Sequence, residues 1–269
     1  MRARYPIGLA LVLALLSSPA ALAADMFYGN TKTALASLTI ADESRAGYDR
    51  DLFKHWVDVD GDRCNARYEV LIAESVKKPR IGSGCSLTGG RWVSAYDGVQ
   101  TSQTNALDID HVVPLAEAWD SGASAWSAAT REAFANDLDD PRSLIAVTAR
   151  SNRQKSDQDP AEWLPTRGRC TYVVNWIAVK VRWQLSVDPV EHQVLTDLIN
   201  ECGLTSLRVR IASITYGDAP APEPSVGTVT EPVKPGAFCA PRGAVGYSTK
   251  GVEYSCKPSD TDTRNRWRR

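Results

Sequence analysis

Hydrophobic and polar positions follow two different periods along residues 26–215 of the chain. Alternation with a period of two predicts strands over 67–75, 91–96 and 107–113, and a short apolar run predicts a buried strand over 143–148. A period near 3.6 predicts helices over 30–40, 127–137, 171–185 and 186–202. Helices and strands are mixed without a strand–helix–strand repeat, so the expected fold class is α+β.

Local features fix some of the expected element ends. Pro114 ends the strand over 107–113, and Asn30 or Thr31 caps the first helix. Asp159 followed by Pro160 predicts a further helix that starts at this pair. The helix over 186–202 is expected to bury Val190, Val194 and Leu198 on one face.

Both ends of the chain differ in character from its middle. Residues 1–23 have a basic start, a short apolar centre and a small-residue cleavage site, which predicts a removed signal peptide and export. Residues 216–235 are rich in proline and predict an extended linker. The expected order is therefore a signal peptide (1–23), a main domain (24–215), the linker (216–235) and a small module (236–269).

The net charge of the chain does not attract polyanions. Without residues 1–23 the chain carries 29 lysine and arginine residues against 32 acids, a net charge of −3. Binding of nucleic acid would therefore depend on a local basic patch. Residues 142–182 hold eight basic residues and three acids, and this local +5 is expected to surround the functional site.

Six cysteines in an exported chain predict disulfides, and six allow fifteen connectivities. Sequential pairing fits the domain plan best, because each pair then closes one local unit. The expected pairs are Cys64–Cys85, Cys170–Cys202 and Cys239–Cys256. The last pair would support a module that is too small to be held by an apolar core alone.

The stretch DIDHVVPLAEAW, residues 108–119, holds one of only three histidines in the chain. Asp108 and Asp110 share one face of the expected strand, and His111 lies on the other. At the end of the strand this restriction relaxes, so an acid and the imidazole can border one cleft. Aspartate is a hard oxygen ligand for divalent ions, and a neutral imidazole beside such an ion can take a proton from water.

A second polar stretch follows about forty residues later, in SLIAVTARSNRQKSDQDPAEW. The expected strand over 143–148 leads into a polar loop, and the loop leads into the helix that begins at Asp159. Asn152 in this loop offers a neutral oxygen ligand. Three basic residues surround it in sequence: Arg150, Arg153 and Lys155.

These sequence motifs together resemble those of the HNH endonucleases. The similarity is greatest to secreted bacterial HNH proteins related to the nuclease domain of modification-dependent restriction enzymes. It rests on CNARYEVL, DIDHVVPLAEAWDSGA, LIAVTARSNRQKSDQDPAEWLP and CTYVVNWIAVKVRW, which span roughly residues 49–202. DHVVP with SNRQKSD also resembles the HNH domain of RNA-guided CRISPR nucleases. The resemblance implies a ββα metal finger and hydrolysis of DNA, or of RNA, with little sequence preference.

The resemblance also implies roles for individual residues. His111 would be the general base, and Asp110 with Asn152 would hold one divalent ion, Mg²⁺ before Mn²⁺ or Ca²⁺. Lys155 and Arg67 would assist at the phosphate. Further substrate contacts would come from basic side chains near the site: Arg142, Arg150 and Arg153. A monomer without a membrane span is expected, and the last residues could bind nucleic acid or the cell envelope.

One departure from the family pattern keeps an alternative open. The middle asparagine that braces the two strands is absent, and Ser143 or Asp140 would have to replace it. A looser site would favour an inactive HNH scaffold that binds DNA or an envelope polymer. A third reading, a calcium-stabilised envelope protein, rests on DVDGD at 58–62, for which a tight acidic turn is the simpler interpretation.

Overall fold

The computed structural model describes residues 25–217, 228–229, 232–237, 239, 245–258 and 265–268. The predicted signal peptide lies outside these residues, as does most of the predicted linker. Residues 25–217 form the main unit, and the described residues from 228 onward form the C-terminal unit. No described helix combines the length and apolar character that crossing a membrane requires.

The main unit mixes helices with short strands. Its α-helices are α1 (Thr31–Leu35), α2 (Ala66–Glu74), α3 (Leu115–Asp120), α4 (Ala128–Ala135), α5 (Ala149–Lys155), α6 (Arg169–Arg182) and α7 (Pro189–Cys202). Its strands are β1 (Met26–Asn30), β2 (Arg80–Ile81), β3 (Leu87–Thr88), β4 (Trp92–Val93), β5 (Gln100–Thr101), β6 (Leu107–His111), β7 (Leu144–Thr148) and β8 (Ser206–Arg210). Short 3₁₀ turns cover Arg50–Leu52, Ser83–Cys85, Thr104–Ala106 and Ala123–Ala125.

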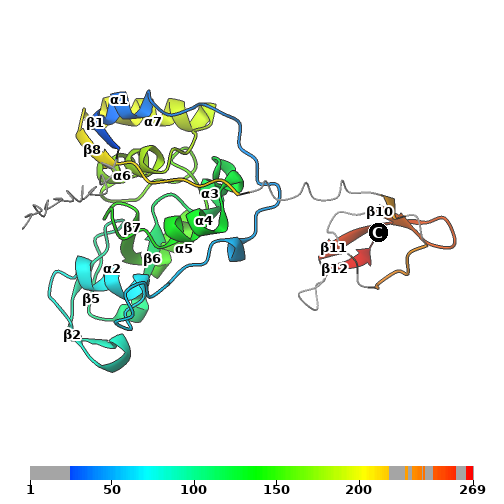
Figure 1. The fold of residues 1–269 in the computed structure, drawn as a ribbon, viewed down its shortest axis with the longest axis horizontal. Coiled ribbons are helices and arrows are strands. Elements are labelled where there is room, and N and C mark those ends of the chain that lie inside the picture. Colours follow the sequence, from blue (N-terminus) through cyan, green and yellow to red (C-terminus); the bar gives the residue numbers. More distant parts are fainter. Residues whose placement is uncertain are drawn as a thin grey trace, which may run out of the picture.

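These strands pair as antiparallel two-stranded ribbons, β1 with β8, β2 with β3, β4 with β5 and β6 with β7. In Figure 1 the β1–β8 ribbon lies beside α1 and α7 at one end of the main unit. Helix α2 and the shortest strands lie at the other end, and β6, β7 and α5 lie between them. The expected α+β class is confirmed.

Helix α6 forms the centre of the main core. Val173, Ile177 and Val181 are buried on it, as their spacing predicts. Trp126 and Trp183 pack edge-to-face or tilted against Phe134 on α4. Burying each large apolar side chain contributes roughly 1.5–3 kcal/mol, so this aromatic and aliphatic cluster is the main source of stability.

The strand predicted over 67–75 is wrong, because this segment is helix α2. Asn65 caps it by accepting a hydrogen bond from the backbone of Tyr68. The buried positions Ala66, Val70 and Leu71 follow the helical period and face β6 and β7. The alternation of apolar residues in RYEVLIAE fits both periods, and packing against the strands selects the helix.

The polar loop predicted after the strand over 143–148 is also wrong. Helix α5 begins directly after β7, and Thr148 caps it through the backbone of Ser151. The helix predicted at Asp159 is a single turn, in which Asp159 accepts hydrogen bonds from the next residues. Pro165 follows too soon for a longer helix to form.

Helix α7 buries part of the expected face, since Leu198 is buried and Val194 packs half-buried against the core, but the expectation for Val190 is wrong. Val190 is 64 % exposed, whereas Leu195, Leu198 and Ile199 are buried. Asp188 caps the helix, as the sequence indicates, by accepting hydrogen bonds from Val190 and Glu191. The buried face includes the carboxylate of Glu191, which an apolar pattern cannot reveal.

All three disulfides follow the sequential pairing. Cys64–Cys85 joins the start of α2 to the loop after β2, and Cys170–Cys202 joins the start of α6 to the end of α7. Cys239–Cys256 lies in the C-terminal unit. Each bridge therefore closes one local part of the fold.

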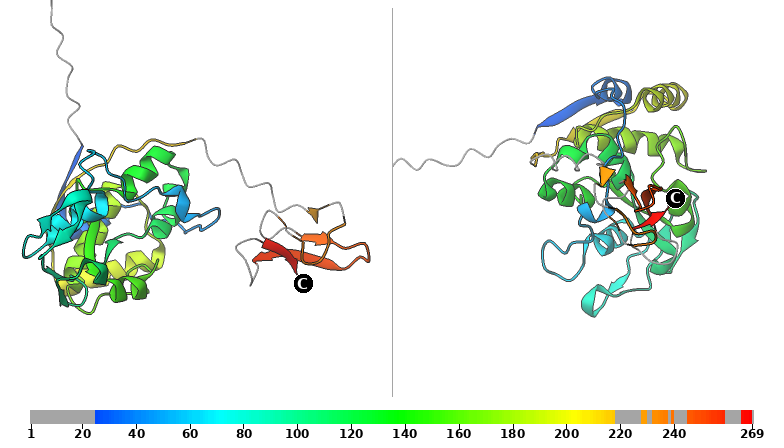
Figure 2. Two further views of the ribbon diagram at one scale, coloured as in Figure 1. Left: turned by 90° about the horizontal axis from the view of Figure 1, so that it is seen from below. Right: turned by 90° about the vertical axis from the view of Figure 1, so that its right-hand side faces the viewer.

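The C-terminal unit is a small sheet with the strand order β12–β11–β10–β9. Its strands are β9 (Thr228–Val229), β10 (Val245–Tyr247), β11 (Glu253–Pro258) and β12 (Asn265–Arg268). Val233, Cys256 and Trp267 form its buried cluster. The left view of Figure 2 shows β10 to β12 side by side in one sheet. With so small a core, the disulfide is its main support.

The Cys170–Cys202 bridge should stabilise the main unit by about 3–4 kcal/mol, since it closes a loop of 32 residues. We expect a Cys170→Ser/Cys202→Ser variant to lose this amount of unfolding free energy in urea titrations. A Cys239→Ser/Cys256→Ser variant is the control and should leave the main transition unchanged. Equal loss in both variants would contradict independent units.

Candidate active site

The DIDH segment lies in a two-stranded ladder with a helix across it. Asp110 on β6 pairs with Ile145 on β7, and His111 pairs with Leu144. Helix α5 starts directly after β7 and packs against both strands. Two chain segments about forty residues apart therefore meet at the end of β6.

The carboxylate of Asp110 is buried and held by two side chains. Lys155 Nζ donates to Asp110 Oδ1 at 3.0 Å and to the backbone oxygen of His111 at 3.0 Å. Tyr96 Oη donates to Asp110 Oδ2 at 2.5 Å. Burial raises the pKa of Asp110 against the opposing pull of Lys155 and Tyr96, and burial lowers the pKa of Lys155.

The imidazole of His111 is oriented by a carbonyl at the end of α4. Its Nε2 lies 2.9 Å from the backbone oxygen of Ala135. A carbonyl only accepts, so Nε2 carries the proton and Nδ1 keeps its lone pair. Burial lowers the pKa of His111 to about 3, and the nearby charges of Arg50 and Lys155 act in the same direction. The ring is therefore neutral at neutral pH.

Aromatic side chains surround this imidazole. Trp56 and His55 lie 5.7 and 6.4 Å from its centroid, and Phe134 stacks on it at 6.4 Å. These contacts restrict rotation of the ring and lower the local polarity. His55 itself donates from Nδ1 to the backbone oxygen of Phe53.

Asn136 holds the chain segment that carries His55 and Trp56, and no sequence motif marks it. Its amide donates to the backbone oxygens of Lys54 and Glu132 at 2.8 Å each, and its oxygen accepts from the backbone of Val57 at 2.8 Å. It thus ties the segment of His55 and Trp56 to the end of α4, beside the carbonyl of Ala135. Only its position after an alanine-rich helix hints at this capping role.

Asn152 projects from α5 toward β6. Its Nδ2 donates to Asp108 Oδ2 at 3.3 Å, and within the described residues no hydrogen bond reaches its Oδ1. A pocket of about 480 Å³ opens here. It brings the three predicted core residues of the site together, with lining residues that include Asp110, His111, Asn152, Arg153, Tyr48, Arg50 and Asp157.

A larger cavity of about 690 Å³ lies elsewhere and has mostly apolar walls, including Val57, Ala133 and Ile211. Most charged side chains on its rim are paired, with Arg182 on Asp137 and Lys54 on Glu132. It offers no base or open ligand set. The smaller pocket at His111 is therefore the candidate active site.

The comparisons with known proteins cover the part of the chain that holds most of the residues of this pocket. A sequence model described as "GmrSD restriction endonucleases, C-terminal domain" matches residues 82–198. An "Uncharacterized secreted protein" of Arthroderma benhamiae is 43 % identical over 171 residues, covering 62 % of this chain and 82 % of that protein. The chain belongs to one family with this secreted protein. No solved structure matches it.

The GmrSD C-terminal family match indicates a nuclease-related function. It includes β6, β7 and α5, and with them Asp110, His111, Asn152 and Lys155. Arg50, which lines the same pocket, lies outside the matched region, as does the whole C-terminal unit. The matched region therefore includes the β6–β7 ladder, whereas the wall of the pocket that contains Arg50 lies outside it.

The predicted phosphate contact of Lys155 is wrong, because this side chain is fully buried under Asp110. Arg67 is not at the pocket either; its guanidinium donates to the backbone oxygens of Thr104 and Leu107 and braces the start of β6. Arg150 is exposed on α5 outside the pocket lining. Of the predicted substrate contacts, Arg153 lines the pocket.

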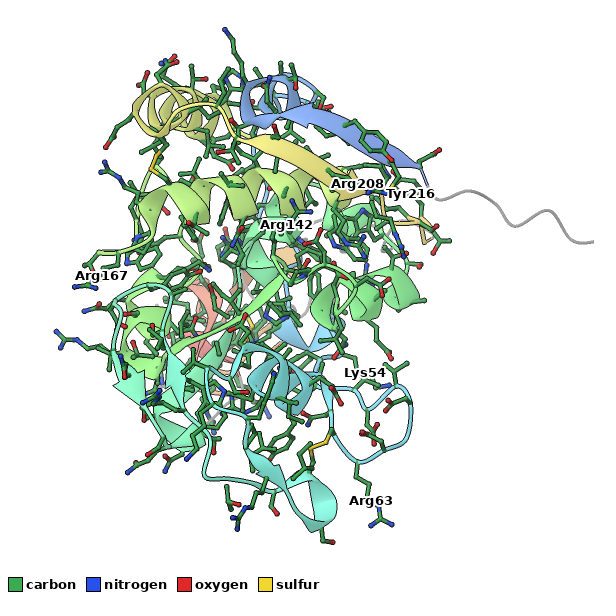
Figure 3. All side chains as sticks on the ribbon, turned by 90° about the vertical axis from the view of Figure 1, so that its left-hand side faces the viewer. Lys54, Arg63, Arg142, Arg167, Arg208 and Tyr216 are labelled. Carbon is green, nitrogen blue, oxygen red and sulfur yellow. A yellow bond between two sulfur atoms is a disulfide. The ribbon has the colours of Figure 1, made fainter. Side chains whose placement is uncertain are left out.

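The expected local charge of +5 around the site is also wrong. Arg142 is paired with Asp140, Arg169 with Glu201, and Arg182 with Asp137. Lys180 is buried between Glu117 and Glu191. Figure 3 shows Arg142 next to Arg208, away from Arg167. Six of the eight basic residues therefore have an acid partner, including Lys155 and, at 3.8 Å, Arg153.

The brace expected from a middle asparagine is divided among other groups. The backbone oxygen of Ser143 accepts from Val112 at 3.0 Å, which extends the ladder one residue past His111. Its hydroxyl donates to Asp137 Oδ2 at 2.7 Å. Asp137 is held in turn by Arg182 and Trp183. The carboxylate of Asp140 pairs with Arg142, and its backbone oxygen accepts from the backbone of Ser143 at 3.0 Å.

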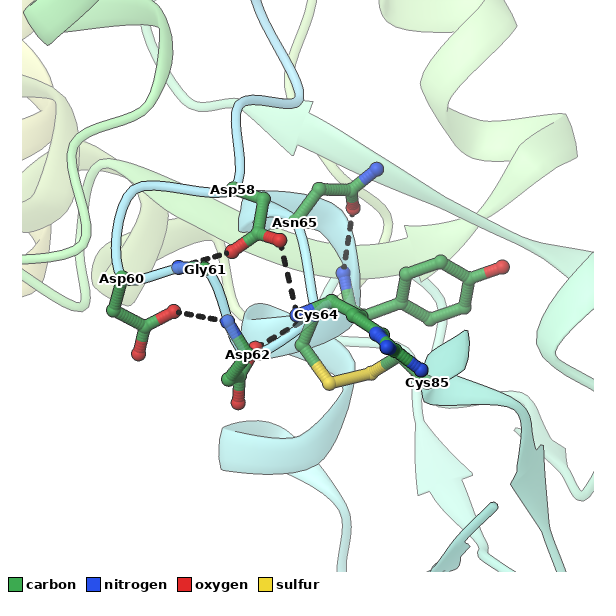
Figure 4. The surroundings of a disulfide bond; sticks show 9 residues. Asp58, Asp60, Gly61, Asp62, Cys64, Asn65 and Cys85 are labelled. Carbon is green, nitrogen blue, oxygen red and sulfur yellow. Dashed lines mark hydrogen bonds between the residues drawn. A yellow bond between two sulfur atoms is a disulfide. The ribbon is translucent and has the colours of Figure 1, made fainter. Parts of the chain in front are cut away.

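DVDGD forms the tight acidic turn that the sequence favours. Asp58 accepts from the backbones of Gly61 and Arg63, and Asp62 accepts from Cys64 (Figure 4). The carboxylates of Asp58, Asp60 and Asp62 are exposed, with oxygens within 4.8 Å of one another. The turn leads directly into the Cys64–Cys85 bridge.

Replacing Lys155 tests the buried ion pair. In a Lys155→Met variant Asp110 is left buried without its counter-charge, which should cost about 3–5 kcal/mol of unfolding free energy. Chemical denaturation at neutral pH measures this loss. Arg150→Gln, an exposed position on the same helix, is the control and should change stability by less than about 0.5 kcal/mol. Similar values for both variants would refute the pairing.

His111 should make stability depend on pH in acid. Its folded pKa of about 3 lies below the unfolded value near 6.5, so the unfolded chain binds the extra proton between these values. The contribution of His111 is complete above about pH 6.5 and falls as the pH drops toward 3, by up to about 1.4 kcal/mol per pH unit. Urea titrations of wild type and His111→Gln should therefore converge as the pH falls from neutral, and parallel curves would contradict a buried neutral ring.

Proposed function

We propose that this chain is a secreted, metal-dependent endonuclease that hydrolyses phosphodiester bonds of DNA, or of RNA, through a ββα finger of the HNH type. The finger consists of β6, β7 and α5. The observation that carries the proposal is the pocket that Asp110, His111 and Asn152 line together. The match of residues 82–198 to the model of the GmrSD restriction endonuclease C-terminal domain supports the same chemistry.

The donor set suits one hard divalent ion. Asp110 offers a carboxylate and Asn152 an amide oxygen without a protein donor among the described residues. Oxygen ligands of this kind suit Mg²⁺, with Mn²⁺ or Ca²⁺ as alternatives. When bound there, the ion would stabilise charge on phosphate oxygens and on the leaving oxygen.

His111 supplies the base. The Ala135 carbonyl holds the tautomer in which Nδ1 has the free lone pair, and the low pKa keeps the ring unprotonated. Nδ1 would take the proton of a water that attacks phosphorus. The aromatic wall of Trp56 and Phe134 keeps the ring in place for this transfer.

Two arginines could hold the phosphate at the mouth of the pocket. Arg153 on α5 is largely exposed, with Asp108 as a distant partner at 3.8 Å. Arg50 lines the same pocket from another chain segment, the 3₁₀ turn before His55. Contacts of this kind neutralise the phosphate backbone without reading bases, which agrees with weak sequence preference.

Export of this chain is part of the proposal. The relative from Arthroderma benhamiae carries the description "secreted", and three disulfides suit an oxidising compartment. The predicted signal peptide at residues 1–23 would direct it there.

One observation favours a second candidate, an inactive scaffold that binds nucleic acid. Both oxygens of Asp110 already accept hydrogen bonds, from Lys155 and Tyr96. Each carboxylate oxygen has two acceptor sites, so an ion can still bind, but the site is less open than a carboxylate facing solvent.

Cleavage of plasmid DNA separates the two candidates. We expect Mg²⁺-dependent nicking that EDTA abolishes, and a loss of about 10²–10⁴-fold in His111→Ala, the usual contribution of a positioned base. Asn152→Ala should lose activity and regain part of it at higher Mg²⁺. The matched control is His192→Ala, a histidine on α7 outside the pocket, which should cut like wild type.

Binding of DNA without cleavage by the wild type would instead support the scaffold. Cleavage by His111→Ala at the wild-type rate would exclude its role as base. Nicking that survives EDTA would exclude a metal-dependent reaction.

A further inference from the structure

Some residues other than glycine have a left-handed backbone in this fold. Five of the described residues do so: Trp56, Arg63, Cys85, Ser156 and Gln184. This conformation is unfavourable for any residue with a Cβ, and a bulky side chain is rarely found in it. Trp56, the largest of the five, has a φ of +61° and lies beside His111. Strain that a fold retains next to reacting groups is expected to serve them.

The side-chain amide of Asn136 holds the backbone on both sides of Trp56. Its Nδ2 donates to the backbone oxygen of Lys54, and its Oδ1 accepts from the backbone nitrogen of Val57, both at 2.8 Å. A third hydrogen bond of 2.8 Å anchors the amide on α4. Asn136 is buried, where water does not compete for these bonds. Because Lys54 and Val57 bracket Trp56, the amide fixes the path of the chain through the left-handed residue.

This path places the indole of Trp56 against the imidazole of His111. The two ring centroids are 5.7 Å apart, and the rings are inclined by 37°. The indole is half-buried and also packs against the apolar cluster of α2, β6 and β7. A negative φ at residue 56 would turn the side chain relative to the segment that Asn136 holds. The indole would then leave the imidazole, so the left-handed backbone is needed for the contact.

Three consecutive residues at the end of α4 act on the same imidazole. Phe134 stacks on it at 6.4 Å, and the backbone oxygen of Ala135 accepts from its Nε2 at 2.9 Å. Asn136 acts through Trp56. The carbonyl determines which nitrogen carries the proton, but a ring held by one hydrogen bond can still rock about it. Contacts with two further rings oppose this motion and keep Nδ1 in one direction.

We propose that Trp56 is a positioning residue for His111, and that Asn136 holds it in the left-handed conformation for this purpose. The proposal rests on the proposed function for the role of His111 as base. Within the described residues, the lining of the pocket does not include Trp56, so the indole acts on the reaction through the imidazole. Loss of the indole should therefore lower turnover and leave substrate binding unchanged.

Urea titrations of two variants test the backbone conformation. Trp56→Gly and Trp56→Ala both remove the indole, but only glycine adopts a positive φ without strain. The unfolding equilibrium constant of Trp56→Ala should exceed that of Trp56→Gly by about 2–10-fold, although glycine has the greater freedom in the unfolded chain. Gln184→Ala and Gln184→Gly form the matched control pair at an exposed left-handed residue, and the same order is expected. A Trp56→Ala variant at least as stable as Trp56→Gly would overturn the proposal.

Turnover distinguishes positioning from a purely structural role. In plasmid nicking with Mg²⁺, Trp56→Ala should lower kcat by about 10–100-fold and change KM by less than about twofold. Trp56→Phe keeps a ring beside His111 and should regain most of kcat. Asn136→Asp keeps the acceptor of the amide, loses both donors, and should lower kcat as Trp56→Ala does. Gln184→Gly should cut like wild type. An unchanged kcat in Trp56→Ala, or a raised KM alone, would overturn the proposal.

The order of the imidazole gives a measurement that does not depend on cleavage. The chain has three histidines, so ¹³C relaxation of their ring carbons can be assigned to each. The order parameter of the His111 ring should fall in Trp56→Ala and stay at the wild-type value in Trp56→Phe and Gln184→Gly. If Trp56→Ala does not fold, Trp56→Leu replaces it in the turnover and relaxation measurements with the same expectations.

The two measurements separate this inference from the proposed function. An unchanged order parameter of the His111 ring in Trp56→Ala would refute the positioning role, whether or not the wild type cuts nucleic acid. A wild type that cuts nothing, with a His111 ring that loses order in Trp56→Ala, would refute the nuclease and leave Trp56 as the residue that orders the imidazole.

Discussion

The candidate site depends on one buried ion pair, between Lys155 on α5 and Asp110 on β6. Taking both charges out of water is unfavourable unless they meet, so the pair fixes the helix on the ladder in one register. The same ammonium also binds the backbone oxygen of His111. Because Asn152 lies one turn before Lys155, this contact sets the distance between the amide, the carboxylate and the imidazole.

The imidazole is positioned from the opposite side by α4. The carbonyl of Ala135 selects the tautomer of His111. Asn136 ties the earlier chain segment that carries Trp56 to the same helix end. Lys155 and Asn136 thus hold two halves of one pocket, although neither is expected to touch substrate. Such a division is useful in a catalytic site, since rigid supporting contacts keep the reacting groups within the narrow geometry that proton transfer requires.

Much of this arrangement could be predicted from the sequence, and the failures have physical causes. The strands around Asp110 and Ala146, the capped helix at Asp188 and the three disulfides follow from local periodicity, caps and cysteine order. The segment around Val70 was misassigned because its apolar residues fit both periods, and only contact with β6 and β7 decides. The expectation for Lys155 fails because a lysine between Gln154 and Ser156 is expected to be exposed to solvent, whereas its buried partner lies forty-five residues away.

Tertiary pairing also explains why the positive charge expected around residues 142–182 is wrong. Counting charges between residues 142 and 182 treats each as exposed, but tertiary folding brings Glu117 and Glu191 to Lys180, and Asp137 to Arg182. Charges used inside the fold create almost no field outside it, because their partners cancel them at short range.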